Sequence, residues 1–189
     1  MNLEKPFLVM FVGGPGSGKT TFARLLAKEL KAVVLNSDAA RMSMWGSKHE
    51  IKAAHANPTE RTYGNQLTFG ALDYTASQIL EASYNVVYDA NANKLGEREK
   101  LAAIATSHEA TPIVVWLKTP TDVALSRITE RQDTHDQMRH DEDKAREIVE
   151  TFRLSIEEPG DNENVVEISG ERPFEEQYHT FAVYLDSLA

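Results

Sequence analysis

Eight residues near the N-terminus have the types and spacing needed to bind phosphate: Gly13-Gly14-Pro15-Gly16-Ser17-Gly18-Lys19-Thr20. They fit G-x-x-x-x-G-K-[ST], the phosphate-binding P-loop. Glycines let the backbone approach a ligand closely, and its N–H groups form a concave nest for phosphate oxygens. The lysine of this pattern reaches the β- and γ-phosphates, and the threonine hydroxyl ligates Mg²⁺. The sequence therefore predicts a site for a nucleoside triphosphate with Mg²⁺, contacted by Gly14, Gly16, Ser17, Gly18, Lys19, Thr20 and Thr21.

A carboxylate and a guanidinium follow the next apolar segment, in Asn36-Ser37-Asp38-Ala39-Ala40-Arg41. Asp38 is placed beside the P-loop, where it can accept the proton of an acceptor hydroxyl and orient that hydroxyl for in-line attack. Arg41 shares its helix face and is predicted to bind an anionic acceptor or the transferred phosphoryl group. The alternative is that Asp38 or Ser37 caps the helix and Arg41 is solvated.

A second acid, Asp89, ends a later apolar run and is followed by Ala90-Asn91-Ala92-Asn93. This position suits a contact to Mg²⁺ through water, so Thr20 and Asp89 are the predicted metal-binding residues. An Asx turn in which Asn93 caps the helix at Leu95 is a second interpretation, and both can hold at once.

Two arginines one helical turn apart, Arg127 and Arg131, precede a long polar stretch. Arginines on a lid can stack on adenine and neutralise charge on the transferring phosphoryl group. We assign Arg127 to the nucleotide and Arg131, with Lys19, Asp38 and Arg41, to catalysis. Arg139 is a weaker candidate of the same kind. The alternative is a solvated helix face, with Asp122 and Glu130 as partners.

The segments between these residues alternate between strand and helix. Apolar runs predict strands at 7–12, 32–36, 85–89, 111–117 and 164–168, and helical periodicity lies between them. This alternation predicts a three-layer α/β/α fold of the P-loop NTPase type, with a five-stranded parallel sheet and ligands beyond the carboxyl ends of its strands. The apolar face of the last helix, from Phe174 to Leu188, is expected to pack on the sheet.

Two polar stretches, 46–61 and 130–144, interrupt this pattern. Both are expected as insertions over the active-site end of the sheet, where mobile functional loops usually lie. We predict one domain over residues 1–189, with an acceptor-side insertion at about 46–61 and a helical lid at about 127–145. His49 and His55 lack metal-ligand spacing, so we interpret them as solvated or substrate-facing.

The composition narrows the function classes. The chain has 189 residues, no cysteine and a net charge of −9, which excludes thiolate metal sites and argues against broad nucleic-acid binding. A local basic pocket remains compatible with that charge. The sequence shows no signal peptide and no membrane span, so a cytoplasmic location is expected.

Over nearly its whole length the chain resembles P-loop kinases of the polynucleotide-kinase-like and zeta-toxin-like group, the AAA-33-type ATP-binding kinases. The resemblance rests on the P-loop, on Ser37-Asp38-x-x-Arg41, on the run 86–91 and on Arg127-x-x-x-Arg131. It implies ATP with Mg²⁺, a mobile lid and phosphorylation of a hydroxyl. It also implies that Asp38 is the general base, and that Arg41 and Arg131 contact the acceptor phosphate and the transferred phosphate.

The leading hypothesis is therefore an ATP-dependent kinase acting on a nucleoside, a nucleic-acid 5′-end or another small molecule. Ala90 replaces the hydroxyl of the Asp-Thr-Asn that polynucleotide kinases often carry, which leaves the acceptor open. A GTPase-like switch is rejected, because Gly96 stands where the base-reading motif needs an acid. A nucleotide-binding ATPase module coupled to a protein partner is the remaining alternative.

Overall fold

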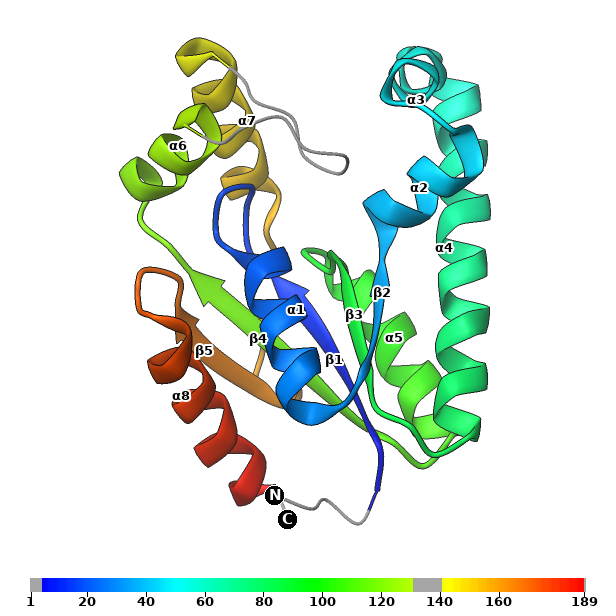
Figure 1. The fold of residues 1–189 in the computed structure, drawn as a ribbon, viewed down its shortest axis with the longest axis vertical. Helices are drawn as coiled ribbons and strands as arrows, with labels where there is room; N and C mark the ends of the chain where they lie inside the picture. The colour runs from blue at the N-terminus through cyan, green and yellow to red at the C-terminus, as the bar shows by residue number, and fades with distance from the viewer. Residues whose placement is uncertain (1–4, 131–140, 189) are drawn as a thin grey trace.

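The computed structural model describes residues 5–130 and 141–188, which form a five-stranded sheet with helices on both faces (Figure 1). The strands are β1 (Phe7–Val12), β2 (Val33–Asn36), β3 (Val86–Asn91), β4 (Thr111–Lys118) and β5 (Val165–Ser169). The helices are α1 (Lys19–Leu30), α2 (Ser37–Trp45), α3 (Lys48–Ala56), α4 (Pro58–Glu81), α5 (Leu95–Ser107), α6 (Thr121–Glu130), α7 (Glu142–Ser155) and α8 (Phe174–Ser187).

The sheet order is β2-β3-β1-β4-β5, and every neighbouring pair is parallel. The predicted three-layer α/β fold is confirmed, with strand starts within one residue of the predicted ones. β3 runs two residues beyond Asp89, and its register with β1 shifts between Met10 and Phe11. Because all strands are parallel, their carboxyl ends lie at one edge of the sheet, and the loops after β1, β2 and β3 meet there.

The central strand explains why residues 7–12 form an uninterrupted apolar run. All six side chains of β1 are buried and alternate between the two faces of the sheet. Phe11 packs with Phe22 of α1 and Phe181 of α8 on one face, whereas Met10 packs with α4 and α5 on the other. Burying one such side chain contributes about 1.5–3 kcal/mol. The predicted packing of the last helix on the sheet is confirmed.

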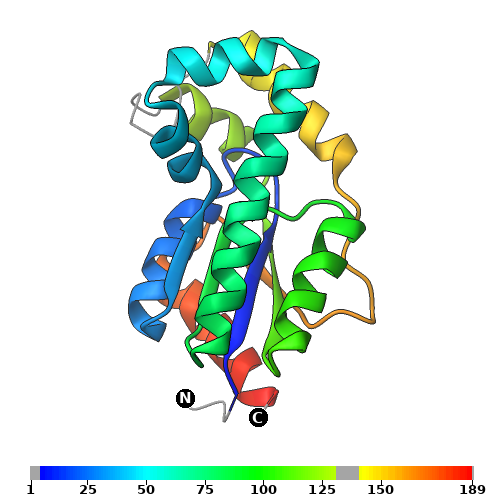
Figure 2. The ribbon, with the colours of Figure 1, turned by 90° about the vertical axis from the view of Figure 1, so that its right-hand side faces the viewer.

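Two groups of helices rise beyond the carboxyl edge of the sheet, as Figures 1 and 2 show. We call α2, α3 and the N-terminal part of α4 the acceptor wall, and α6 with α7 the lid arm. The acceptor wall is packed tightly where Trp45 meets Gly64, since a Cβ on Gly64 would lie 2.8 Å from the indole. The lid arm has its own small core of Ala124, Ile128, Ala145 and Val149.

The segment 46–61 lies beyond the carboxyl edge of the sheet, as expected for an insertion at the active-site end, but most of it is helical and not a loop. The Ser47 hydroxyl caps α3 by accepting a hydrogen bond from the Glu50 N–H at 3.2 Å. The Asn57 side chain caps α4 in the same way, and Pro58 occupies the first helical position. Both devices stabilise helix starts in polar sequence. Among the helices in the described ranges, none is long and apolar enough to cross a membrane.

Candidate active site

The P-loop connects β1 to α1 and forms one side of a cleft of about 670 Å³. Gly18 precedes the first residue of α1 and has a φ of 97°, and Gly16 has a φ of 78°. A side chain is strained at either φ, and a Cβ on Gly16 would collide with the carbonyl oxygen of Ala124 in α6. The loop is therefore held against the lid arm. The first residues of α1 line the cleft, and a helix N-terminus there favours an anion.

Lys19 lies folded back on the loop. Its Nζ donates hydrogen bonds to the carbonyl oxygens of Gly13 and Gly14, at 2.7 and 2.8 Å. Burial lowers the pKa of Lys19 to about 8, although the charges of Asp89 and Asp38 partly oppose that shift. An anion placed in the loop would raise this pKa again, because it favours the charged form of the lysine, so the site suits a phosphate group.

Thr20 and Asp89 lie side by side at the floor of the cleft. The Thr20 hydroxyl donates to Oδ1 of Asp89 at 3.3 Å, and the Asn36 amide donates to Oδ2. Burial raises the pKa of Asp89, while the hydrogen bonds from Asn36 and Thr20 and the charge of Lys19 lower it in part. A hydroxyl beside a buried carboxylate provides the oxygen ligands that Mg²⁺ prefers. The donor set therefore fits the metal that the sequence predicts.

Asp38 and Arg41 lie on α2 and line the same cleft. Their side chains form an ion pair at 2.9 Å, with Asp38 60 % exposed and Arg41 14 % exposed. Arg41 also donates to Asn65 at 3.2 Å and lies over the Phe69 ring. The alternative in which Asp38 or Ser37 caps the helix is wrong, because Asn36 accepts the capping hydrogen bond from the Ala39 N–H.

The cleft continues from Asp38 along one face of α3. Lys48, Ile51, Lys52 and His55 line it at the spacing of a single helix face. Burial lowers the pKa of His55, and the positive charges of Arg41 and Arg61 act in the same direction. The cleft is therefore cationic in a chain whose net charge is −9. The sequence offered a signal for this face, the i, i+4 spacing of Lys48 and Lys52.

Arg127, on α6, lies beside the P-loop, and its contact with a nucleotide stays a prediction. It donates to the Gly16 carbonyl oxygen at 3.3 Å and to the Gly170 carbonyl oxygen at 2.8 Å. The alternative expected from the sequence was an ion pair with Asp122 or Glu130. Among the contacts of the described residues, Arg127 makes no such ion pair. Arg131 and Arg139 lie outside the described residues.

A second cavity, of about 700 Å³, lies on the other side of the P-loop, beneath α7. Trp116 and Lys118 of β4 line it, and the Lys118 ammonium lies 4.0 Å from the centre of the indole ring. Lys118 also pairs with Glu167 of β5 at 2.6 Å. Because Lys19, Asp38 and Asp89 all line the first cleft, the chemistry is assigned there.

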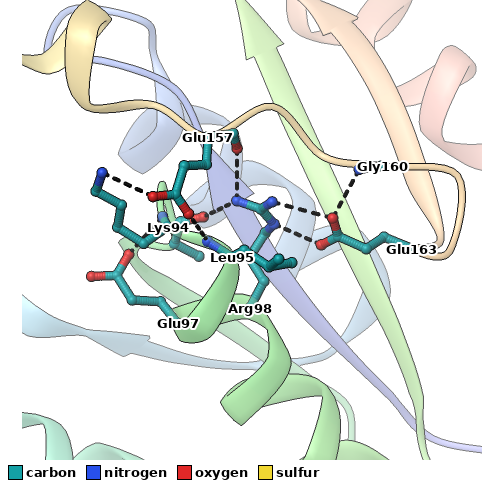
Figure 3. A network of polar contacts seen from close by, with 8 residues as sticks. Lys94, Leu95, Glu97, Arg98, Glu157, Gly160 and Glu163 are labelled. Carbon is teal, nitrogen blue, oxygen red and sulfur yellow. Dashed lines mark hydrogen bonds and ion pairs between the residues drawn. The ribbon is translucent and has the colours of Figure 1, made fainter.

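Asn93 lies beside the P-loop, and the second interpretation from the sequence, in which it caps the helix at Leu95, is wrong. It does not cap α5, whose N-cap is Lys94. Its side chain is buried and makes two hydrogen bonds with the backbone of Gly13, the first residue of the P-loop. Behind it, Arg98 is 1 % exposed and forms an ion pair with Glu163 (Figure 3). No local spacing signals either contact, because the partners lie 80 and 65 residues apart.

The architecture is similar to that of several solved structures, two of which are named as kinases. Kti12 of Chaetomium thermophilum in complex with ADP-AlF3 has a TM-score of 0.67 at 19% identity, over 96% of this chain and 99% of that one. A sugar kinase of Janibacter sp. HTCC2649 has a TM-score of 0.66 at 19% identity, over 96% and 94%. The APS kinase CysC of Mycobacterium tuberculosis, in complex with AMPPNP and APS, has a TM-score of 0.61 at 17% identity, over 96% and 98%.

A sequence comparison with curated proteins gave no match. The family described as AAA domain matches residues 8–159, which include the P-loop, Asp38, Asp89, Asn93 and the whole lid arm. This match does not separate the polynucleotide-kinase-like and zeta-toxin-like group from other members. Since the matched region covers most of the 189 residues, the chain belongs to the AAA domain family.

Proposed function

We propose that this chain is an ATP-dependent kinase that transfers the γ-phosphoryl group to a hydroxyl of a small anionic molecule. The observation that carries the proposal is one continuous cleft, in which the P-loop lysine, an exposed carboxylate and a cationic helix face meet. The similar structures include kinases named for small-molecule acceptors and proteins in complex with AMPPNP or ADP-AlF3, which supports the same reading.

The nucleotide half of the site is built from the P-loop, Lys19 and Arg127. Thr20 and Asp89 are the residues that would hold Mg²⁺. When bound, such an ion neutralises charge on the phosphate oxygens. Lys19 would leave the carbonyl oxygens of Gly13 and Gly14 and turn to the phosphates, because a phosphate oxygen is the stronger partner for an ammonium group.

The acceptor half of the site contains the proton acceptor. Asp38 is oriented by its ion pair with Arg41 and has one face open to the cleft. It would accept the proton of the acceptor hydroxyl as the new bond between that oxygen and the γ-phosphorus forms and the bond from the γ-phosphorus to the bridging oxygen breaks; this oxygen leaves with ADP. General-base catalysis of this kind contributes about 10²- to 10⁴-fold in rate.

The charge of the cleft indicates the class of acceptor. Arg41, Lys48 and Lys52 contribute positive charge beyond Asp38, while Met42 and Phe69 contribute apolar surface. An acceptor with a carboxylate or phosphate group and an apolar part matches this lining, because the anionic group pairs with the cations and the apolar part covers the ring. A long nucleic acid fits less well, because the net charge of −9 repels its backbone.

The test is a transfer screen with γ-labelled ATP against pairs of alcohols that differ only in one carboxylate or phosphate group. We expect transfer to the charged member of a pair, and a loss of about 10²- to 10⁴-fold in Asp38→Asn with ADP affinity unchanged. Asp186→Asn, which removes an exposed carboxylate on α8, is the matched control and should act as the parent.

Three results would contradict parts of the proposal. Asp38→Asn at the parental rate would mean that Asp38 is not the base. Equal rates of transfer to the neutral and charged alcohols would contradict the inference that the acceptor is anionic. ATP consumption that no alcohol accelerates would favour the alternative, an ATPase module coupled to a protein partner.

A further inference from the structure

Asn93 makes a two-point contact with the residue at which β1 becomes the P-loop. Its Oδ1 accepts from the Gly13 N–H at 2.9 Å, and its Nδ2 donates to the Gly13 carbonyl oxygen at 3.3 Å. Asn93 is 5 % exposed, so water does not compete for these bonds. Gly13 has no room for a side chain of its own, because a Cβ would lie 2.9 Å from the Ser17 hydroxyl and 3.0 Å from the Leu117 carbonyl oxygen.

The Gly13 carbonyl oxygen is shared between Asn93 and Lys19, whose Nζ donates to it at 2.7 Å. When Lys19 turns to a phosphate, that carbonyl loses one of its two partners. Asn93 then supplies the remaining bond. A buried carbonyl group without any partner is unfavourable, so Asn93 makes the release of Lys19 easier.

The backbone of Asn93 is held in turn by the segment that follows α7. The Glu157 N–H donates to the Asn93 carbonyl oxygen at 2.8 Å. Arg98 donates from one nitrogen to the carbonyl oxygens of Ala92 and Glu157, at 3.2 and 2.9 Å. Figure 3 shows the Arg98 guanidinium between this segment and the start of α5, with Glu163 paired to its other side at 2.6 and 3.2 Å.

The same segment is continuous with the part of the lid arm that lies over the P-loop. Ile156 follows α7, and a Cβ on Gly14 would touch Phe152 of its last turn at 3.9 Å. Contacts therefore run from Gly13 through Asn93 to Glu157 and into α7. Arg98 holds the middle of this path in place, because it bonds to the backbone on both sides of it.

We propose that Asn93 is a positioning residue for nucleotide binding. It holds Gly13 in the phosphate-binding shape and keeps the Gly13 carbonyl oxygen bonded when Lys19 moves. Arg98 holds Asn93 against the end of α7 and thereby links the shape of the P-loop to the lid arm. The inference rests on the nucleotide-binding half of the proposed function and is independent of the acceptor.

The experiment measures the dissociation constant of ADP and, separately, the urea denaturation of each variant. Asn93→Ala should weaken ADP binding about tenfold or more, because both bonds to Gly13 are lost. Asn93→Asp keeps the acceptor for the Gly13 N–H but loses the donor to the Gly13 carbonyl oxygen, so it should also weaken ADP binding. Arg98→Met should weaken ADP binding by a smaller factor, and Arg98→Lys should restore part of the loss.

Asn85 offers a matched control, since its Oδ1 accepts from the Phe7 N–H at the other end of β1, at 3.1 Å. Asn85→Ala should lower stability and leave the affinity for ADP unchanged. Arg146→Met, on an exposed ion pair of α7, is the control for Arg98. In the kinase assay the Asn93 variants should raise the KM for ATP more than the KM for the acceptor.

The proposal is overturned if Asn93→Ala and Asn93→Asp lower stability but bind ADP as the parent does, because the contact would then be structural only. If Asn93→Ala does not fold, Asn93→Asp decides alone, since it preserves the size of the side chain. Failure of phosphate transfer in the parent, with ADP affinity still dependent on Asn93, would refute the kinase proposal and leave this one standing.

Discussion

The affinity of the protein for ADP should fall steeply as the pH rises above 8, because Lys19 loses its proton there. Burial lowers the pKa of Lys19 from 10.5 to about 8 in the free protein. A phosphate group beside the ammonium favours the charged form, so the pKa in the complex lies higher. Binding is then coupled to proton uptake, and the affinity decreases wherever the free lysine is neutral.

The magnitude follows from the pKa. With a value of about 8, about three quarters of the Lys19 side chains are protonated at about pH 7.5, and about 3 % at about pH 9.5. The dissociation constant of ADP should therefore rise about 25-fold over this interval, which corresponds to about 2 kcal/mol. The terminal phosphate of ADP, with a second pKa of about 6, is already largely ionised at about pH 7.5, so it contributes little to the change.

Isothermal titration calorimetry at a series of pH values measures this effect, and buffers with different ionisation enthalpies report the proton uptake directly. Lys19→Arg is the control, because a guanidinium group stays charged over the whole interval. A parental affinity that is constant up to about pH 9.5 would refute the reasoning. A decrease of equal size in Lys19→Arg would show that another group titrates.

Two further predictions concern the acceptor wall and the metal-binding residues. Gly64→Ala should destabilise the fold by about 1–3 kcal/mol, since its Cβ would meet Trp45 at 2.8 Å. Gly70→Ala on the same helix has open space around the new Cβ and should stabilise the fold by up to about 1 kcal/mol. Urea denaturation measures both variants, and equal effects on stability would contradict the prediction. Asp89→Asn should raise the Mg²⁺ concentration needed for half-maximal transfer without destabilising the protein, because it removes a buried carboxylate whose pKa burial has raised. An unchanged Mg²⁺ requirement would show that Asp89 does not hold the metal.

Much of the fold could be predicted because its signals are local. The run 7–12 is apolar throughout since β1 is covered on both faces, and such a run needs no knowledge of its neighbours. The P-loop is a contiguous pattern, and Asp38 and Arg41 follow β2 within five residues. The starts of α3 and α4 could also be predicted, because Ser47 with Glu50 and Asn57 with Pro58 are ordinary helix starts. The many charged and polar residues of the segment 46–61 favoured a loop, in spite of these capping signals.

The parts that could not be predicted depend on tertiary contacts. Asn93 has a local use as a helix cap, and only the packing of β3 beside β1 shows that it binds Gly13 instead. Arg98 reads as one more charged residue on an exposed helix, yet it is buried against Glu163. Leu67 is apolar but exposed, because the buried face of α4 runs through Gly64, Thr68, Leu72, Ala76 and Leu80.

The packing of Trp45 on Gly64 gives the acceptor wall an optical reporter of its own. The chain has only two tryptophans, and the other, Trp116, lies in β4 beside the second cavity with Lys118 over its ring. Trp116→Phe leaves an emission that comes from the acceptor wall alone, and Trp45→Phe leaves one from the sheet beneath the lid arm. Each single-tryptophan protein can be titrated with ADP and then with an alcohol while its fluorescence is recorded. Without any label, the change in emission would show which ligand alters the acceptor wall and which alters the sheet beneath the lid arm.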